Sequence, residues 1–349
     1  MNSKLSSARH PPVTKNQIVH DLRKIGITKG NIVAVSLSLK SVGFVEGGPD
    51  AFIDALLEVV GLEGTIMMNT FTQFFPIREM PYDYIFDALT TIPYTGIVPT
   101  TLMKRQSSVR SRHPTCSVVS TGKMADYLTH GHDEKSKAFL PYEKLAQIGG
   151  KYLSVGIGNN LVAIRHEAQR KAGISTTLPV GVRYKDAKGE TKLFIFESPP
   201  CAANLTELIP KLDMQGIVKR GQLGMVSTII ANANEVISSM SSMLSENPQL
   251  NLCNNIYCLR CRELERKMNL YDRIANPALH QRSRLARKIV SFRNRLILKK
   301  YSHVAFCELK RNGNSNIFST LCWRIIDAPL ALFQKIQNYL VRSFEKNSK

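Results

Sequence analysis

Strand-like apolar segments that alternate with amphipathic helical ones are the feature that most constrains the fold of this chain. Residues 31–39, NIVAVSLSL, are rich in β-branched side chains, and a helical pattern runs from Pro49 to Gly61. Further strands are predicted at 65–72, 116–122, 152–158 and 194–198, and further helices at 15–27, 96–106, 123–131, 141–149, 164–173 and 234–244. Such alternation is typical of α/β or mixed α+β architecture.

The N-terminal segment, the lengths of the apolar runs and the cysteine count together predict a cytoplasmic protein. The chain has 349 residues, 43% of them hydrophobic, which is enough for one large domain or two ordinary ones. The first nineteen residues lack the apolar segment of a secretory signal, and no run approaches the length of a membrane-spanning helix. Seven cysteines, an odd number, favour a reducing compartment over a disulfide framework.

Most of the net charge of +20 belongs to the C-terminal tail. From Arg262 onward there are 19 basic and 6 acidic residues, against 28 and 21 in the rest of the chain. Segments 283–300 and 329–344 are predicted to be basic amphipathic helices. They suit an appendage that packs on the core or on a partner subunit of a homo-oligomer, and the alternative is peripheral contact with the inner face of the membrane. No nucleic-acid readout is expected, because no aromatic-stacking or zinc-finger pattern accompanies the charge.

Three cysteines with metal-ligand spacing lie just before this tail. Cys253, Cys258 and Cys261 form a C-x4-C-x2-C pattern, and Cys201 is a candidate fourth ligand. Four thiolates could hold a structural Zn²⁺ ion. The alternative is that they are simply buried small side chains. A catalytic zinc is not expected, since no histidine-rich set accompanies the cysteines.

A single histidine follows a glycine turn at the end of a predicted strand. The segment 152–158, YLSVGIG, precedes Arg165, His166 and Glu167. By itself His166 could be an ordinary surface or core histidine. It could also be a general base at the rim of an active site, because the unperturbed pKa of histidine is close to neutral pH.

Four segments, taken in order, resemble one enzyme family. They are 33–72, 109–128, 140–158 and 163–169. Their order and spacing are similar to those of the aminoglycoside 3-N-acetyltransferases, which use acetyl-coenzyme A. The resemblance covers roughly residues 15–260. It implies an α/β fold, with a mixed α+β central sheet flanked by helices, in an acetyltransferase-like domain at 15–262. Residues 1–14 would be a flexible N-terminus, and 263–349 a basic helical extension.

The resemblance implies that His166 is the general base that accepts a proton from the acceptor amine. Two departures from the family pattern weaken this role: Ala163 stands where the family has Thr, and Gln169 stands where it has Glu. Glu167 is close in sequence but would lie on another side of the helix. His113, in an Arg-Ser-x-His-Pro motif, is a second catalytic candidate. Alternatively, it organises the turn before Pro114.

The resemblance also implies where acetyl-coenzyme A binds. Small hydroxyls, exposed amides and a cation after the first strand suit a pantetheine–pyrophosphate arm. Arginines near the second motif could bind the phosphates. The predicted coenzyme-binding residues are Ser36, Ser38, Lys40, Ser41, Gly43, Thr70, Arg110 and Ser111.

The net charge of the family-like region indicates which small-molecule amine is the expected acceptor. Because residues 1–261 are net positive, long-range steering disfavours a polycation. We therefore expect an amine on a nucleotide- or lipid-linked amino sugar of cell-surface polysaccharide synthesis. One alternative is true aminoglycoside acetylation, which would confer antibiotic resistance. Another is a non-catalytic, coenzyme A-binding relative.

Overall fold

The computed structural model describes residues 11–272 except 158–160, 162, 177, 204–207, 254 and 256–257. Residues 281–349 form a unit separate from 1–280 and lie outside the described residues. The predictions for the two basic tail helices, and for the N-terminus up to residue 10, therefore concern parts that the structure does not describe. The last described helix, α10 (Leu259–Asp272), crosses the domain boundary expected at 262.

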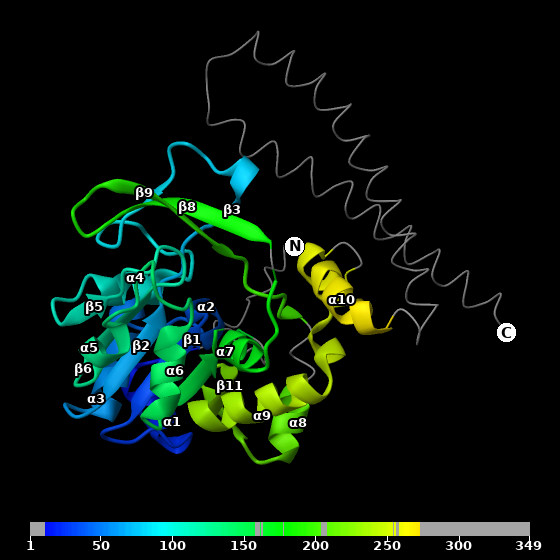
Figure 1. Cartoon of the computed structure of the whole chain (residues 1–349). Helices are drawn as coiled ribbons and strands as arrows, with labels where there is room; N and C mark the ends of the chain where they lie inside the picture. Colours follow the sequence, from blue (N-terminus) through cyan, green and yellow to red (C-terminus); the bar gives the residue numbers. More distant parts are fainter. Residues whose placement is uncertain are drawn as a thin grey trace, which may run out of the picture. The chain divides into compact units, whose positions relative to one another are not determined.

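A seven-stranded mixed sheet forms the centre of the domain, in the order β10-β11-β7-β1-β2-β6-β5 (Figure 1). The three central strands β7, β1 and β2 are parallel, and antiparallel strands extend the sheet on both sides. This confirms the predicted mixed α/β class. The strands are β1 (Ile32–Leu37), β2 (Thr65–Asn69), β5 (Ser108–Arg110), β6 (Val118–Gly122), β7 (Lys151–Val155), β10 (Val218–Leu223) and β11 (Val226–Asn232).

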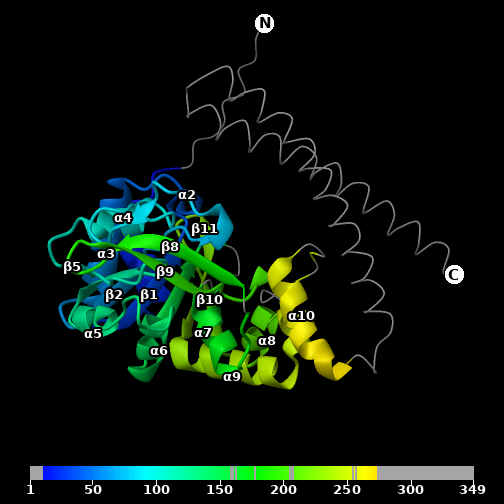
Figure 2. The ribbon, with the colours of Figure 1, turned by 45° about the horizontal axis from the view of Figure 1, so that its top comes forward.

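Alternate residues of the central strands pack into two apolar cores, one on each face of the sheet. Val33 and Val35 of β1 pack with one set of helices, and Ala34 between them packs with the other. The first set comprises α1 (Lys15–Lys24), α3 (Gly48–Val60) and α4 (Ile97–Met103). The second comprises α5 (Ala125–Thr129), α6 (Leu140–Gln147), α7 (Ile164–Lys171), α8 (Ile209–Met214) and α9 (Ala233–Glu246), of which α7, α8 and α9 lie next to one another in Figure 2.

Local signals set the bounds of several helices. Thr14 caps α1 by accepting the Gln17 amide, and Asn232 caps α9 by accepting two amides of its first turn. Helix α3 ends at Gly61, whose φ of 66° is left-handed, as the sequence predicted. None of the described helices combines the length and the apolarity that crossing a bilayer requires.

A smaller sheet lies beside the central one. Its long hairpin β8 (Pro179–Lys185) and β9 (Thr191–Glu197) pairs with the short strands β3 (Phe75–Pro76) and β4 (Ile85–Phe86). A separate apolar cluster that includes Phe86, Val182 and Phe194 supports it. Only β9 was predicted. Short helices within the described residues are α2 (Leu39–Val42) and the 3-10 helices η1 (Ile77–Glu79) and η3 (Pro248–Asn251).

Candidate active site

The segment after β1 lies against the segment after β7, at the carboxyl edge of the sheet. The Ser38 amide donates to the Val155 carbonyl at 2.9 Å, and the Ser41 hydroxyl donates to the Gly156 carbonyl at 3.0 Å. Gly156 has a φ of 65°, and a Cβ there would come within 2.5 Å of the Ser41 Cβ. From β1 the chain leads to β2 on one side, and from β7 to β11 on the other. The carboxyl ends of β1 and β7 therefore mark a switch point in the topology, the position at which open α/β sheets bind ligands.

The predicted coenzyme residues of this segment lie in different environments. Lys40 is exposed, and Ser38 and Ser41 are partly exposed and hydrogen-bonded to each other. Gly43 has a φ of 109°, and a Cβ there would be 2.9 Å from the Met225 sulfur. A side chain at this position would thus be strained and crowded, which explains the glycine.

Ser36 faces the protein interior instead. Its hydroxyl accepts the Asn69 amide at 3.1 Å and the Tyr152 hydroxyl at 2.7 Å. Tyr142 donates in turn to Asn69 Oδ1 at 2.5 Å, and burial raises the pKa of its hydroxyl well above the usual value. These four side chains form a buried polar network that ties β1 to β2, α6 and β7. Sequence reasoning missed this network, because its members are far apart in the chain.

Arg110 forms its hydrogen bonds with other parts of the protein. Its guanidinium donates to the carbonyl oxygens of Ala88, Thr91 and Thr70 at 3.2, 2.7 and 3.1 Å. Its Nε lies between the hydroxyls of Thr70 and Ser117, at 3.3 and 3.2 Å, and burial lowers its pKa to about 10. Four of its five N–H groups are therefore engaged by the chain. Arg110 and Thr70 hold the 88–91 loop to the end of β2, and this arrangement favours a structural role over phosphate binding.

The histidine of the second motif is also engaged internally. His113 Nδ1 accepts the amides of Thr115 and Cys116 at 3.3 and 3.1 Å, and burial lowers its pKa to about 4. Ser111 accepts the Val118 amide at 2.9 Å and contacts His132. The geometry favours the alternative in which His113 organises the turn before Pro114. A catalytic part for it remains a prediction.

His166 lies near the start of α7, where the chain leaves the carboxyl end of β7. Its ring stacks on Phe139, with centroids 4.8 Å apart and planes inclined by 19°. Its Nδ1 is 2.6 Å from Gln169 Oε1. The Gln169 amide nitrogen donates to the Cys201 carbonyl at 2.8 Å and also to Asn251 Oδ1. Because both of these partners are acceptors, the Gln169 oxygen must face His166 and accept from its Nδ1.

This arrangement defines the protonation state of His166. Since Nδ1 carries the hydrogen, Nε2 keeps its lone pair, and no described residue forms a hydrogen bond with Nε2. Desolvation, aided by the nearby charge of Arg165 and Arg260, lowers its pKa to about 3 although Gln169 acts in the opposite direction. His166 is therefore a neutral hydrogen-bond acceptor at physiological pH.

Glu167 points elsewhere, as its place on the helix predicted. Its carboxylate forms a two-point ion pair with Arg170, with distances of 2.8 and 2.5 Å, and only 2% of the residue is exposed. Burial raises its pKa. Of Glu167 and Gln169, only Gln169 forms a hydrogen bond with His166 in the described part of the chain.

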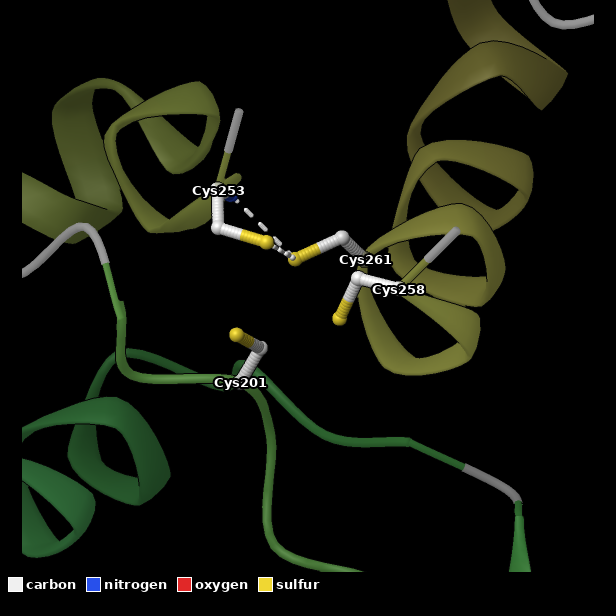
Figure 3. A group of neighbouring side chains, drawn as sticks. All are labelled: Cys201, Cys253, Cys258 and Cys261. Atoms are coloured by element: carbon white, nitrogen blue, oxygen red, sulfur yellow. Dashed lines mark hydrogen bonds between the residues drawn. The ribbon is translucent and has the colours of Figure 1, made fainter. Parts of the chain in front are cut away.

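The four predicted cysteines come together (Figure 3). The sulfur atoms of Cys201, Cys253, Cys258 and Cys261 all lie within 4.8 Å of one another. Cys201 follows β9, Cys253 follows η3, and the other two stand at the start of α10. Their thiols do not ionise independently. Hydrogen bonds from the other cysteines, that of Cys261 first, lower the pKa of Cys201 to about 5, and the hydrogen bond with Cys201, together with burial, raises the pKa of Cys261.

Comparison with known proteins identifies the class that this fold and site define. The family model for aminoglycoside 3-N-acetyltransferase matches residues 34–245. Aminoglycoside N(3)-acetyltransferase VII of Streptomyces paromomycinus is 28% identical over 267 residues, covering 65% of this chain and 89% of the relative. Aminoglycoside N(3)-acetyltransferase VIII of Streptomyces fradiae is 31% identical over 177 residues, covering 46% of this chain and 62% of the relative.

A solved structure agrees with these relatives. The crystal structure of aminoglycoside acetyltransferase AAC(3)-IIb superimposes with a TM-score of 0.61 at 25% identity, covering 68% of this chain and 98% of that one. The chain thus belongs to the aminoglycoside 3-N-acetyltransferase family. The predicted family and enzyme class, an N-acetyltransferase, are confirmed. The comparisons favour the aminoglycoside alternative over the nucleotide- or lipid-linked sugar that the charge argument put first.

Proposed function

We propose that this protein transfers the acetyl group of acetyl-coenzyme A to an amine of an aminoglycoside, with His166 as general base. The observation that carries the proposal is the orientation of the imidazole, whose Nδ1–H is held by Gln169 and whose Nε2 lone pair is left to accept a proton. As the amine nitrogen attacks the thioester carbonyl, Nε2 takes a proton from the nitrogen. A C–N bond forms, and as the C–S bond breaks the imidazolium returns that proton to the sulfur, so that coenzyme A leaves as its thiol.

The acetyl donor is proposed to lie along the carboxyl ends of β1 and β7. Ser38, Lys40 and Ser41 are the accessible polar groups there, and Lys40 is the exposed cation suited to a phosphate. Four other predicted residues have polar groups that are already hydrogen-bonded to the chain, and we assign them to support of the fold rather than to contact with the donor: Arg110, Ser111, Thr70 and Ser36. The donor would then reach His166, which follows β7.

An anionic amino sugar is the second candidate acceptor, and one observation favours it. Arg165 and Arg260 lie close enough to His166 to lower its pKa by their charge, and Arg260 also stacks over Phe74 at 5.9 Å. A polycation would meet these charges unfavourably, whereas a phosphate-linked sugar would not. The family relatives nevertheless support the aminoglycoside first.

The test is release of free thiol from acetyl-coenzyme A by purified protein. Parallel panels contain aminoglycosides and nucleotide-linked amino sugars, and His166→Ala and His166→Gln serve as controls. We expect turnover with aminoglycosides, reduced by roughly 10²- to 10⁴-fold in both variants. Turnover on the sugar panel alone would select the second acceptor. Coenzyme binding by calorimetry without turnover on either panel would contradict the proposal and indicate a non-catalytic relative.

A further inference from the structure

We propose that Cys201, Cys253, Cys258 and Cys261 bind one structural Zn²⁺ ion, and that this ion holds Gln169 in the position that orients His166. The second half rests on the proposed function, because it concerns the proposed base. Three of the four cysteines lie beyond residues 34–245, which the family model matches. The site is thus assigned from this chain alone.

The geometry of the four sulfur atoms fits a tetrahedral thiolate site. Zinc–sulfur bonds of about 2.3 Å place the four sulfurs of such a site about 3.8 Å apart. Here Cys253 and Cys261 Sγ are 3.5 Å apart, and no pair among the four exceeds 4.8 Å. Side-chain shifts below about 1 Å would close the four thiolates around one ion.

The surrounding backbone also suits thiolate ligands. The Cys253 amide donates to Cys261 Sγ at 3.3 Å, and an N–H group aimed at a sulfur stabilises its negative charge. Cys258 directly precedes α10, and Cys261 lies in its first turn, where the helix dipole favours anions. Arg260 and Arg262 flank Cys261 in the chain. They would offset part of the double negative charge of a zinc ion with four thiolates.

Two hydrogen bonds connect the cysteine cluster to the catalytic histidine. Both acceptors of the Gln169 amide nitrogen belong to the segments that carry the ligands: the Cys201 carbonyl itself, and Asn251, two residues before Cys253. Asn251 and Gln169 are both fully buried. An ion that joins Cys201 to Cys253 fixes the spacing of the two acceptors, and through Gln169 it fixes the imidazole.

The ion would also explain how α10 is attached. Among the described side chains of α10, only Cys261 and Leu264 are buried, at 4% and 5% exposure. Lys267 donates to the carbonyl and to the hydroxyl oxygen of Ser175, at 3.2 and 3.4 Å. Such limited apolar burial leaves this helix weakly held, and a metal that joins it to two loops compensates for this.

Metal analysis tests the site itself. Full-length protein from zinc-supplemented medium, purified under reducing conditions without chelator, should contain one zinc ion per chain. Cys258→Ala should lose it, whereas Cys258→His should keep it, because zinc also accepts imidazole nitrogen. Cys116→Ser, which alters a buried thiol outside the cluster, should keep it too. Absence of zinc, together with no tetrahedral thiolate absorption on adding Co²⁺, would overturn the proposal. Iron in its place, or a disulfide, would do the same.

The link to His166 needs a separate readout. Loss of zinc in Cys258→Ala should shift the imidazole ¹⁵N resonance of His166, and Cys258→His should restore it. In thiol-release assays kcat should fall roughly 10- to 100-fold with the KM for acetyl-coenzyme A unchanged. Adding Gln169→Leu to Cys258→Ala should cause no further loss. An identical His166 resonance with and without zinc would refute the link. If no turnover is found in any variant, the metal content and the resonance still decide this proposal.

Discussion

The imidazole rings of His113 and His132 stack on each other, with their centroids 4.9 Å apart and their planes inclined by 26°. Each ring is 1% exposed and is bonded as the neutral form. His113 Nδ1 accepts two backbone amides, and His132 Nε2 lies 3.2 Å from the Ala138 carbonyl, to which it donates. Burial lowers the pKa of His113 to about 4 and that of His132 well below 6.5. Protonating either ring would place a charge in the core beside its neighbour.

This pair predicts acid sensitivity of the fold. Because the folded pKa values are depressed, the unfolded chain binds more protons below pH 6.5, and the free energy of unfolding decreases as the pH falls toward 4. Between pH 6.5 and 5.5 the two rings together should cost about 2 kcal/mol. Urea denaturation at pH 7.5, 6.5 and 5.5 measures this. His113→Asn, whose amide oxygen can replace Nδ1 as acceptor, should remove about half of the effect. Equal stability at all three pH values would contradict it.

Arg110 and Lys40 predict opposite outcomes for two substitutions at cationic residues. Arg110→Met should lower the free energy of unfolding by about 2 to 4 kcal/mol, because it removes the donor to the carbonyls of Ala88 and Thr91 and leaves the Thr70 carbonyl with Ser117 as its remaining side-chain donor. Lys40→Ala, at an exposed position, should leave stability within about 0.5 kcal/mol and raise the KM for acetyl-coenzyme A. Urea denaturation and thiol-release kinetics on both variants measure this. An Arg110→Met protein of normal stability with weakened coenzyme binding would restore the phosphate-binding role.

The contact between Ser41 and Gly156 predicts that substitutions at these two positions have coupled effects on stability. Gly156→Ala should destabilise the protein by about 1 to 3 kcal/mol, because the new Cβ meets Ser41 Cβ at 2.5 Å and φ is 65°. It should also raise the KM for acetyl-coenzyme A by displacing the segment after β1. Ser41→Gly in the same chain removes the clash but not the backbone strain, so it should recover part of the stability. Denaturation of the two single variants and the double variant measures the coupling. Strict additivity would argue against the clash.

The sequence predicts those parts of the fold that depend on local pattern. β1, β2, β6, β7 and the helices from α1 to α7 that carry apolar periodicity lie where it placed them, and Gly61 ends α3 as expected. The strand β10 (VKRGQL) was not predicted, because an edge strand exposes alternate positions and reads as polar. The two-residue strands β3 and β4 exist only because β8 pairs with them, which no local pattern records.

Within the site, the sequence pattern predicted which residues lie close together better than it predicted what each residue does. The cysteines 52 residues apart, Cys201 and Cys253, were brought together as the pattern suggested. Arg110 was predicted to bind phosphates, but its contacts lie in a loop 19 to 22 residues upstream that has no sequence signature. Gln169 was noted only for the charge that it lacks. Its function as the acceptor for His166 depends on Cys201 and Asn251, 32 and 82 residues away.

Gln169→Glu provides the last prediction, since it restores the residue typical of the family. A carboxylate beside Nδ1 should raise the pKa of His166 despite the nearby charges of Arg165 and Arg260, because it stabilises the imidazolium. The acid limb of the kcat/KM profile should therefore move toward neutral pH. The carboxylate would also face the Cys201 carbonyl and Asn251 Oδ1 without a proton to donate, which should cost about 1 to 3 kcal/mol of stability. Gln169→Leu, the control, should lose activity without that shift of the profile. An acid limb that is identical in Gln169→Glu and the parent would show that residue 169 does not set the basicity of His166.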